Sequence, residues 1–371
     1  MGRQIQMTVF ALITWAAFAQ SGPSSQGETV LKTQFVEVQP DVKLEVLDWG
    51  GTGRNLVLLA GLGSTAHVFD SLGPKLAAHY HVIGITRRGF GQSSAPQTGY
   101  GPRRLGDDVV AVLDALHIAD PVLVGHSIAG EELSAVSTYH PGRAAALIYL
   151  DATGTFALYN PKYGDYTPAL AQLKDDLSAL QKNLFDDDLI SKTLTDMTLF
   201  QAYLADIRGE VEGGTGPDPK PNDLASISAF QSYMKGYYGG IIPETEVRQL
   251  HRIGEDGRVG EFLGPGYAGQ SVMLEEERFH SIDTPLLAIL SYPGASNPGQ
   301  TSDPAKLAAS RAAETRREES QIAIFREQPH AKVVVIPNAT HFIFLSREEE
   351  VISQISDFVN SLPAKRKQSQ K

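Results

Sequence analysis

The sequence predicts an α/β fold with a mostly parallel central sheet, helices on both faces of that sheet, and a helical insertion. Three observations lead to this prediction. Short apolar segments alternate with segments whose apolar residues recur at helical spacing, which is typical of parallel strands covered on both sides. The alternation stops between Ala152 and Thr284 and then resumes. A chain of 371 residues with 42% hydrophobic residues is long enough to bury such a core.

The elements follow one another in chain order. Gln34–Val38 and Lys43–Asp48 alternate apolar and polar residues, which predicts an antiparallel hairpin at the edge of the sheet. Apolar strands are then predicted at Asn55–Ala60, His81–Ile85, Pro121–Gly125, Ala146–Leu150, Pro285–Leu290 and Ala331–Ile336. The helices that cover them are predicted at Val68–His79, Arg104–His117, Glu131–Tyr139, Lys306–Gln328 and Arg347–Leu362.

The insertion divides the core into two parts. Residues 34–151 form its first part, residues 152–284 form a helical cap or lid, and residues 285–363 form its second part. Helices are predicted in the cap at Pro168–Asn183, Asp187–Asp206 and Asp223–Tyr238. Gly209–Pro221 is rich in glycine and proline, which predicts a mobile loop.

Both ends of the chain are expected to lie outside the fold. Arg3, the apolar run Met7–Phe18 and the small-x-small tripeptide Ala17-Phe18-Ala19 together indicate a secretory signal at residues 1–19. We therefore expect an exported protein, periplasmic or secreted, without a stable membrane span after processing; an uncleaved anchor is the main rival. Residues 20–33 are expected to be a flexible leader and residues 364–371 a disordered basic tail.

Composition narrows the range of partners and cofactors. The formal net charge of −11 argues against nucleic acid as a partner, because phosphate binding needs a basic surface. The chain has no cysteine, so disulfides and thiol chemistry are excluded. It carries neither an H-E-x-x-H motif nor a dinucleotide fingerprint, so we expect no metal and no organic cofactor.

The most informative segment is Val122–Gly130, which reads V-L-V-G-H-S-I-A-G. A strand, a sharp turn and a helix follow one another here, and Ser127 stands at the turn. Small residues around such a serine permit the tight backbone that exposes its hydroxyl. The segment resembles the nucleophile elbow of the α/β-hydrolase family, G-x-S-x-G, with Ala129 in the place of the last glycine. The competing interpretation is that Ser127 only caps the following helix.

A histidine late in the chain has the place that this family gives to its catalytic base. His341 lies in a loop after the apolar strand Ala331–Ile336 and before the last helix. The resemblance implies that it accepts the proton of Ser127. The alternative is a solvated loop histidine. His126 adjoins the serine on the turn and is expected to be structural.

Two further motifs resemble the same family. Gly61-Leu62-Gly63-Ser64 follows a strand, as does the family's H-G-x-G loop, with Ala60 in the place of the histidine. By this resemblance the backbone amides of Leu62 and Ile128 form the oxyanion hole. The segment Thr86–Ser93 resembles the family's D-x-R-G-x-G-x-S turn, so its arginines Arg87 and Arg88 are expected to be structural; an anion site is the alternative.

The acid of the predicted triad has two candidates. Asp151 directly follows the strand Ala146–Leu150 and is preferred, because some members of the family place the acid there. Asp303 is the first carboxylate after the penultimate strand, where the acid more often lies. Asp151 could instead cap a helix at the start of the cap, and the site could lack a working acid.

The resemblance implies a serine hydrolase that cleaves a carboxylic ester or lactone through an acyl-enzyme, with a small-molecule acyl substrate. A serine at position 127 excludes dehalogenases and epoxide hydrolases, which use aspartate there. A peptidase, a carbon–carbon bond hydrolase and a cofactor-free haloperoxidase of the same superfamily remain open, as does a non-catalytic binding protein on this scaffold. These motifs encode neither the identity of the substrate nor the oligomeric state.

Overall fold

The structure of the protein is a computed structural model that describes residues 31–152, 157–160, 162, 168–213, 219–275, 277–295, 311, 315 and 318–363. The expected signal segment, the basic tail and Asp303 lie outside the described residues, as does the leader up to residue 30. Of the helix expected at Lys306–Gln328, residues 318–326 are helical.

Within the described residues, eight strands form one sheet, in the order β1-β2-β4-β3-β5-β6-β9-β10. The pairs from β4 through β10 are parallel, whereas β1 and β2 pair antiparallel and join the edge next to β4. The bounds of the strands are β1 Lys32–Gln39, β2 Val42–Gly50, β3 Asn55–Leu59, β4 His81–Ile85, β5 Val122–His126, β6 Ala146–Leu150, β9 Leu286–Ser291 and β10 Ala331–Ile336. The predicted mostly parallel sheet is confirmed.

Helices cover both faces of this sheet because successive strand residues point to opposite sides. Leu56 and Leu58 of β3 pack in one cluster with α1 (Leu72–Ala77) and α11 (Glu348–Ser361). Val57 and Leu59 pack in another with α2 (Pro102–Ala115) and α3 (Ala129–Tyr139). Strands that are buried on both faces explain why their sequences read as unbroken apolar runs.

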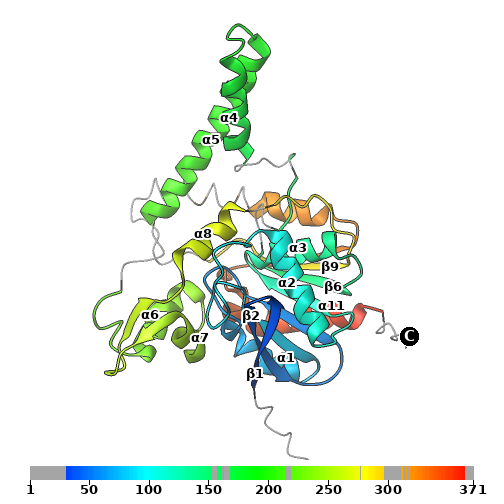
Figure 1. Ribbon diagram of the computed structural model, residues 1–371, viewed down its shortest axis with the longest axis vertical. Coiled ribbons are helices and arrows are strands. Elements are labelled where there is room, and N and C mark those ends of the chain that lie inside the picture. The colour runs from blue at the N-terminus through cyan, green and yellow to red at the C-terminus, as the bar shows by residue number, and fades with distance from the viewer. Residues whose placement is uncertain are drawn as a thin grey trace, which may run out of the picture.

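The insertion after β6 is mainly helical, as predicted, and it also holds a short antiparallel pair of strands that the sequence analysis did not foresee. A long hairpin of α4 and α5 projects away from the sheet (Figure 1). The bounds are α4 Pro168–Leu180, α5 Asp187–Gly213, α6 Ile227–Tyr238, α7 Glu244–Leu250, β7 His251–Ile253, β8 Val259–Phe262 and α8 Gly266–Leu274. The small helix α7 returns to the core and packs beside η1, a 3₁₀ helix over Ala66–Phe69.

Several predicted elements have other bounds in the structure, and two of these differences have a clear local cause. Helix α5 continues to Gly213, so the loop expected from Gly209 was wrong for residues 209–213. The glycines in this stretch cost a helix only about 1 kcal/mol each, and the first proline of the segment is Pro217. The single helix expected at Val68–His79 is divided into η1 and α1, because the Thr65 hydroxyl caps a separate 3₁₀ turn by accepting the His67 amide.

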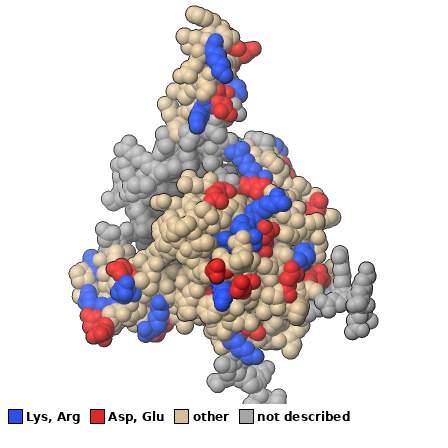
Figure 2. All heavy atoms as spheres, in the orientation of Figure 1, with Lys and Arg blue, Asp and Glu red and all other residues tan. Residues whose placement is uncertain are grey.

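The surface carries charges of both signs. On the face shown in Figure 2, lysine and arginine side chains are interspersed with aspartate and glutamate. Over the described ranges, no helix has both the length and the apolar character that crossing a membrane requires.

Candidate active site

Ser127 stands between the end of β5 and the start of α3 with a backbone φ of +55°, in the left-handed region that residues other than glycine rarely adopt. The neighbouring small residues explain how the chain holds this turn. A Cβ on Gly125 would lie 3.0 Å from the Ala129 carbonyl oxygen, and one on Gly130 would lie 2.9 Å from the Ala157 Cβ. Larger side chains at these places would push the helix away, so the sequence permits the turn only with small residues there.

Three of the predicted site residues form one chain of hydrogen bonds. The Ser127 hydroxyl lies 2.8 Å from Nε2 of His341, with the geometry of a bond donated to that nitrogen. On the other side of the ring, Nδ1 of His341 lies 2.9 Å from Oδ2 of Asp151. The three residues come from the carboxyl ends of β5 and β6 and from the loop after β10, which parallel pairing brings to the same edge of the sheet.

Asp151 is held rigidly where the insertion begins. Its φ is +45°, its amide donates to the Ile289 carbonyl oxygen at 2.8 Å, and its Oδ1 accepts the Ser291 amide at 2.8 Å. The Ser291 hydroxyl donates to the Ala339 carbonyl oxygen at 2.7 Å, which ties the end of β9 to the loop of His341. One oxygen of Asp151 is therefore fixed to the backbone while the other faces His341. The alternative acid, Asp303, is outside the part of the chain that the structure describes.

The loop Gly61–Thr65, called the glycine loop below, packs against the turn of Ser127. A Cβ on Gly61 would lie 3.2 Å from the Cβ of Ser127 and 2.7 Å from Nδ1 of His126. Within the described residues, the backbone amides of Leu62 and Ile128 donate no hydrogen bond to a protein acceptor. The two predicted donors thus stand on segments that both adjoin the serine, and their N–H groups have no protein acceptor among the described residues.

His126 is buried, with 1% of its surface exposed, and it supports the loop of His341 rather than reaching toward its imidazole nitrogens. Its Nε2 lies 2.9 Å from the His341 carbonyl oxygen, a contact that requires the proton on Nε2. Burial and the proximity of His341 hold the pKa of His126 well below its usual range, so the ring is neutral. This geometry agrees with the structural role expected for His126.

A buried carboxylate of the insertion binds Thr65, the last residue of the glycine loop. Oε1 of Glu246, on α7, accepts the Thr65 amide at 3.0 Å, and the Thr65 hydroxyl donates to Oε2. Burial raises the pKa of Glu246 to about 7, although the bonds from Thr65 oppose this shift. Glu246 could not be predicted from the sequence, because no motif marks a glutamate that approaches a loop 181 residues away.

The buried His67 lies beside the same loop. Burial lowers its pKa, but hydrogen bonds to Asp70 and Glu45 outweigh that effect and raise the pKa to about 9.

In the described part of the chain, no group of three or more His, Cys, Asp or Glu side chains has the arrangement of metal ligands. The hydrogen-bonded serine, histidine and aspartate can transfer a proton without a metal ion.

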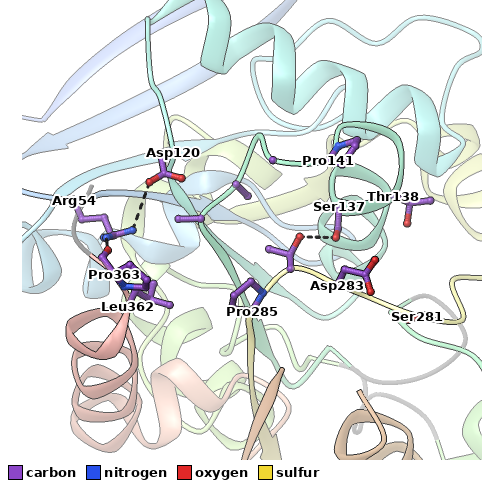
Figure 3. Close-up of a pocket in the computed structure, with 14 residues that line it drawn as sticks. Arg54, Asp120, Ser137, Thr138, Pro141, Ser281, Asp283, Pro285, Leu362 and Pro363 are labelled. Carbon is purple, nitrogen blue, oxygen red and sulfur yellow. Dashed lines mark hydrogen bonds and ion pairs between the residues drawn. The ribbon is translucent and has the colours of Figure 1, made fainter. Parts of the chain in front are cut away.

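A separate surface pocket of about 540 Å³ lies at the opposite end of the sheet. Arg54 precedes β3, Asp120 precedes β5 and Pro285 precedes β9, so these lining residues mark the amino ends of the strands. Arg54 pairs with Asp120, and its guanidinium also donates to the Pro363 carbonyl oxygen (Figure 3). A strand of five residues spans roughly 17 Å, so this pocket is a full strand length from Ser127.

The alpha/beta hydrolase family profile matches residues 56–354 of the chain. The chain belongs to the alpha/beta hydrolase family. The match runs from β3 into α11, so it includes the parallel strands, the insertion, and all three residues of the hydrogen-bonded chain.

Individual hydrolases of this family resemble the chain at low identity. The 2-(acetamidomethylene)succinate hydrolase of Mesorhizobium japonicum is 25% identical over 203 residues, which cover 52% of this chain and 66% of that protein. A crystal structure of E-2-(acetamidomethylene)succinate hydrolase superposes with a TM-score of 0.55 at 19% identity and covers 89% of this chain and 100% of the other. An esterase from Exiguobacterium antarcticum also gives 0.55, at 15% identity, covering 89% of this chain and 100% of the other.

The chain spans 59%, 66% and 39% of the length of three curated relatives that it matches in sequence. The structural likenesses show the alpha/beta hydrolase fold with its helical insertion.

Proposed function

We propose that this protein is a serine hydrolase that cleaves a carboxylic ester or a lactone through an acyl-enzyme. The observation that carries the proposal is the unbroken chain from the Ser127 hydroxyl through both nitrogens of His341 to Oδ2 of Asp151, with bonds of 2.8 and 2.9 Å. A serine is a weak nucleophile unless a positioned base accepts its proton, and this arrangement supplies that base together with a carboxylate that orients it.

In the first half of the reaction, Oγ of Ser127 attacks the substrate carbonyl carbon while Nε2 of His341 takes the hydroxyl proton. Asp151 accepts the bond from Nδ1–H and stabilises the imidazolium that forms. The carbonyl oxygen becomes an oxyanion and accepts hydrogen bonds from the amides of Leu62 and Ile128. These two amides have no protein acceptor among the described residues. Collapse of the tetrahedral intermediate breaks the bond to the alcohol oxygen, which takes its proton from His341. The alcohol of an ester then departs, whereas that of a lactone stays attached to the acyl group.

In the second half, a water molecule takes the position that the alcohol oxygen held beside His341. His341 removes a proton from the water, the resulting hydroxide attacks the acyl carbon, and the acid product leaves as the proton returns to Oγ of Ser127. The same two amides stabilise the second oxyanion. No step requires a cofactor.

Esters and lactones are proposed as the substrate class because they are frequent substrates of this family, and the Exiguobacterium structure with the same fold is named an esterase. The test is hydrolysis of a panel of p-nitrophenyl esters of graded acyl length, together with simple lactones, by purified wild type and by Ser127→Ala. We expect turnover by the wild type that falls by on the order of 10³-fold or more in the variant. Equal hydrolysis by both proteins would refute the proposal.

We also propose that the protein is exported after cleavage near Ala19. The proposal is supported by the pattern of residues 1–19, a basic start, an apolar run and a small-x-small site. Intact-mass measurement of protein recovered from the exporting compartment tests it. A chain that begins near Gln20 is the expected result, and a mass that retains Met1–Ala19 would contradict it.

A further inference from the structure

Arg87, in the turn after β4, is buried and makes a two-pronged ion pair with Glu132 of α3. Its Nε lies 2.7 Å from Oε1 and its Nη2 lies 2.8 Å from Oε2, and the side chains of the two residues are 4% and 5% exposed. This fork geometry is the strongest form of arginine–carboxylate contact. Removing two charges from water is costly, and a buried ion pair is by itself weak evidence for a contribution to stability. The other hydrogen bonds of the guanidinium indicate a role other than stabilising the fold.

The remaining hydrogen bonds of Arg87 go to the start of the glycine loop. Nη2 donates to the Ala60 carbonyl oxygen at 2.9 Å, and Nη1 makes a longer bond of 3.4 Å to the Gly61 carbonyl oxygen. The Gly61 carbonyl and the Leu62 N–H belong to one planar peptide group and point in opposite directions. The Ser64 amide also donates to the Gly61 carbonyl oxygen, at 3.3 Å. The cation of Arg87 at the same oxygen therefore adds to the contacts that orient the Leu62 N–H, and its positive charge polarises that N–H as a donor.

The pair also joins the two segments that carry the uncommitted amides. Glu132 lies in the first turn of α3, the helix that directly follows Ile128, whereas Arg87 binds the peptide of Leu62. The Ile128 amide is fixed in a similar way. It shares a peptide group with the backbone carbonyl of Ser127, whose oxygen accepts a hydrogen bond from the Gly130 amide at 2.9 Å. Each amide thus belongs to a peptide whose carbonyl oxygen is held by a donor.

We propose that Arg87 is a positioning residue of the oxyanion hole: held by Glu132, it orients and polarises the Gly61–Leu62 peptide so that the Leu62 amide meets the developing oxyanion. The proposal rests on the serine hydrolase function proposed above. It also accounts for one of the two arginines for which the sequence left an anion site open. Four of the five N–H groups of Arg87 would be needed for its contacts with Glu132, Ala60 and Gly61.

The neighbouring Arg88 offers a matched control. It is also buried and forks onto a carboxylate, with bonds of 2.6 and 2.7 Å to Asp108, and its Nη2 also donates to Gln39 rather than to the glycine loop. Arg87→Lys and Arg88→Lys therefore both break a buried fork in the same turn. Only the first removes a contact with the peptide of Leu62.

The experiment measures, for each variant, the melting temperature, kcat and KM for the best ester of the panel, and the rate at which an alkyl fluorophosphonate modifies Ser127. Arg87→Lys should lower kcat and the phosphonylation rate by about 10- to 100-fold, since removing one oxyanion donor outright costs about 10²- to 10³-fold. KM should change by less than about threefold, because the contact acts in the transition state. Glu132→Gln, which keeps the shape of the pair, should show a smaller loss of the same kind.

Arg88→Lys should lower the melting temperature at least as much while leaving both rates within about threefold of wild type. Equal losses of rate in the two lysine variants, or wild-type rates in a folded Arg87→Lys, would overturn the positioning role while leaving the proposed function in place. If Arg87→Lys does not fold, Glu132→Gln decides: an unchanged phosphonylation rate overturns the proposal. Failure of the fluorophosphonate to modify wild-type Ser127 would overturn both.

Discussion

Replacing Asp151 by asparagine should disable the site while leaving the fold intact. Asparagine tolerates the left-handed backbone that Asp151 adopts at φ +45°. Its amide oxygen can replace Oδ1 and keep the 2.8 Å bond from the Ser291 amide. The NH₂ group cannot take this place, because the Ser291 N–H is itself a donor and needs an acceptor. The amide NH₂ must then face Nδ1 of His341, which lies 2.9 Å from Oδ2 in the wild type.

This orientation reverses the tautomer of the base. An NH₂ group facing Nδ1 requires that nitrogen to be unprotonated, so the proton moves to Nε2, the nitrogen that must accept from Ser127. The same substitution in a serine-protease triad lowers kcat by about 10⁴-fold. A loss of that size corresponds to about 5 kcal/mol of transition-state stabilisation. We expect a comparable loss here because the bond from Ser291 prevents the amide from rotating to the productive orientation.

The assay is steady-state hydrolysis of the best ester of the panel, with thermal unfolding to verify the fold and Asp303→Asn as the companion variant. Asp303→Asn should stay within roughly tenfold of wild type. A severe loss in Asp303→Asn with near-normal activity in Asp151→Asn would transfer the role to Asp303. Near-normal activity in both variants would show that neither aspartate completes a triad.

Two further predictions concern the glycine loop and the pH dependence of stability. Gly61→Ala should lower kcat by roughly 10²-fold, the scale of a lost oxyanion donor, because the added Cβ would lie 2.7 Å from Nδ1 of His126. Gly269→Ala is the control, since its Cβ would meet open space. Equal kinetics in the two variants would contradict the prediction. Because the folded-state pKa of Glu246 is raised to about 7, the folded protein binds this proton more tightly than the unfolded chain, and its stability should fall as pH rises from about 4.5 to 7. Glu246→Gln should lack this pH dependence. Its free energy of unfolding in urea should therefore rise by up to about 3 kcal/mol relative to that of the wild type across that interval. Parallel pH profiles for the two proteins would refute the raised pKa of Glu246.

The fold could be predicted because its signals are local. The apolar strands and the small residues around Ser127 each constrain the backbone within a few positions, and Asp151 could be placed because it directly follows a strand. The end of α5 could not be placed in the same way, since Glu210, Val211 and Glu212 suit a helix as well as a polar loop.

The supporting contacts of the site are long-range, which is why sequence patterns did not disclose them. The Arg87–Glu132 pair joins residues 45 positions apart, and its proposed role depends on a further hydrogen bond from Arg87 to the carbonyl oxygen of Gly61. Glu246 bonds to Thr65 across 181 positions and from a different part of the fold. The nearest sequence signal was the pair of arginines beside glycines at Arg87 and Arg88, whose carboxylate partners emerge only from the packing.

The central claim is that Ser127 is an activated nucleophile. The most direct measurement is intact-protein and peptide mass spectrometry after brief incubation with an alkyl fluorophosphonate, with Ser127→Ala and His341→Ala treated in parallel. We expect one stoichiometric adduct on the peptide that carries Ser127, no adduct in Ser127→Ala, and labelling slowed by on the order of 10³-fold in His341→Ala. A folded wild-type protein that binds small ligands, as judged by thermal shift, yet acquires no adduct on Ser127 would contradict the claim and indicate a binding protein on a hydrolase scaffold.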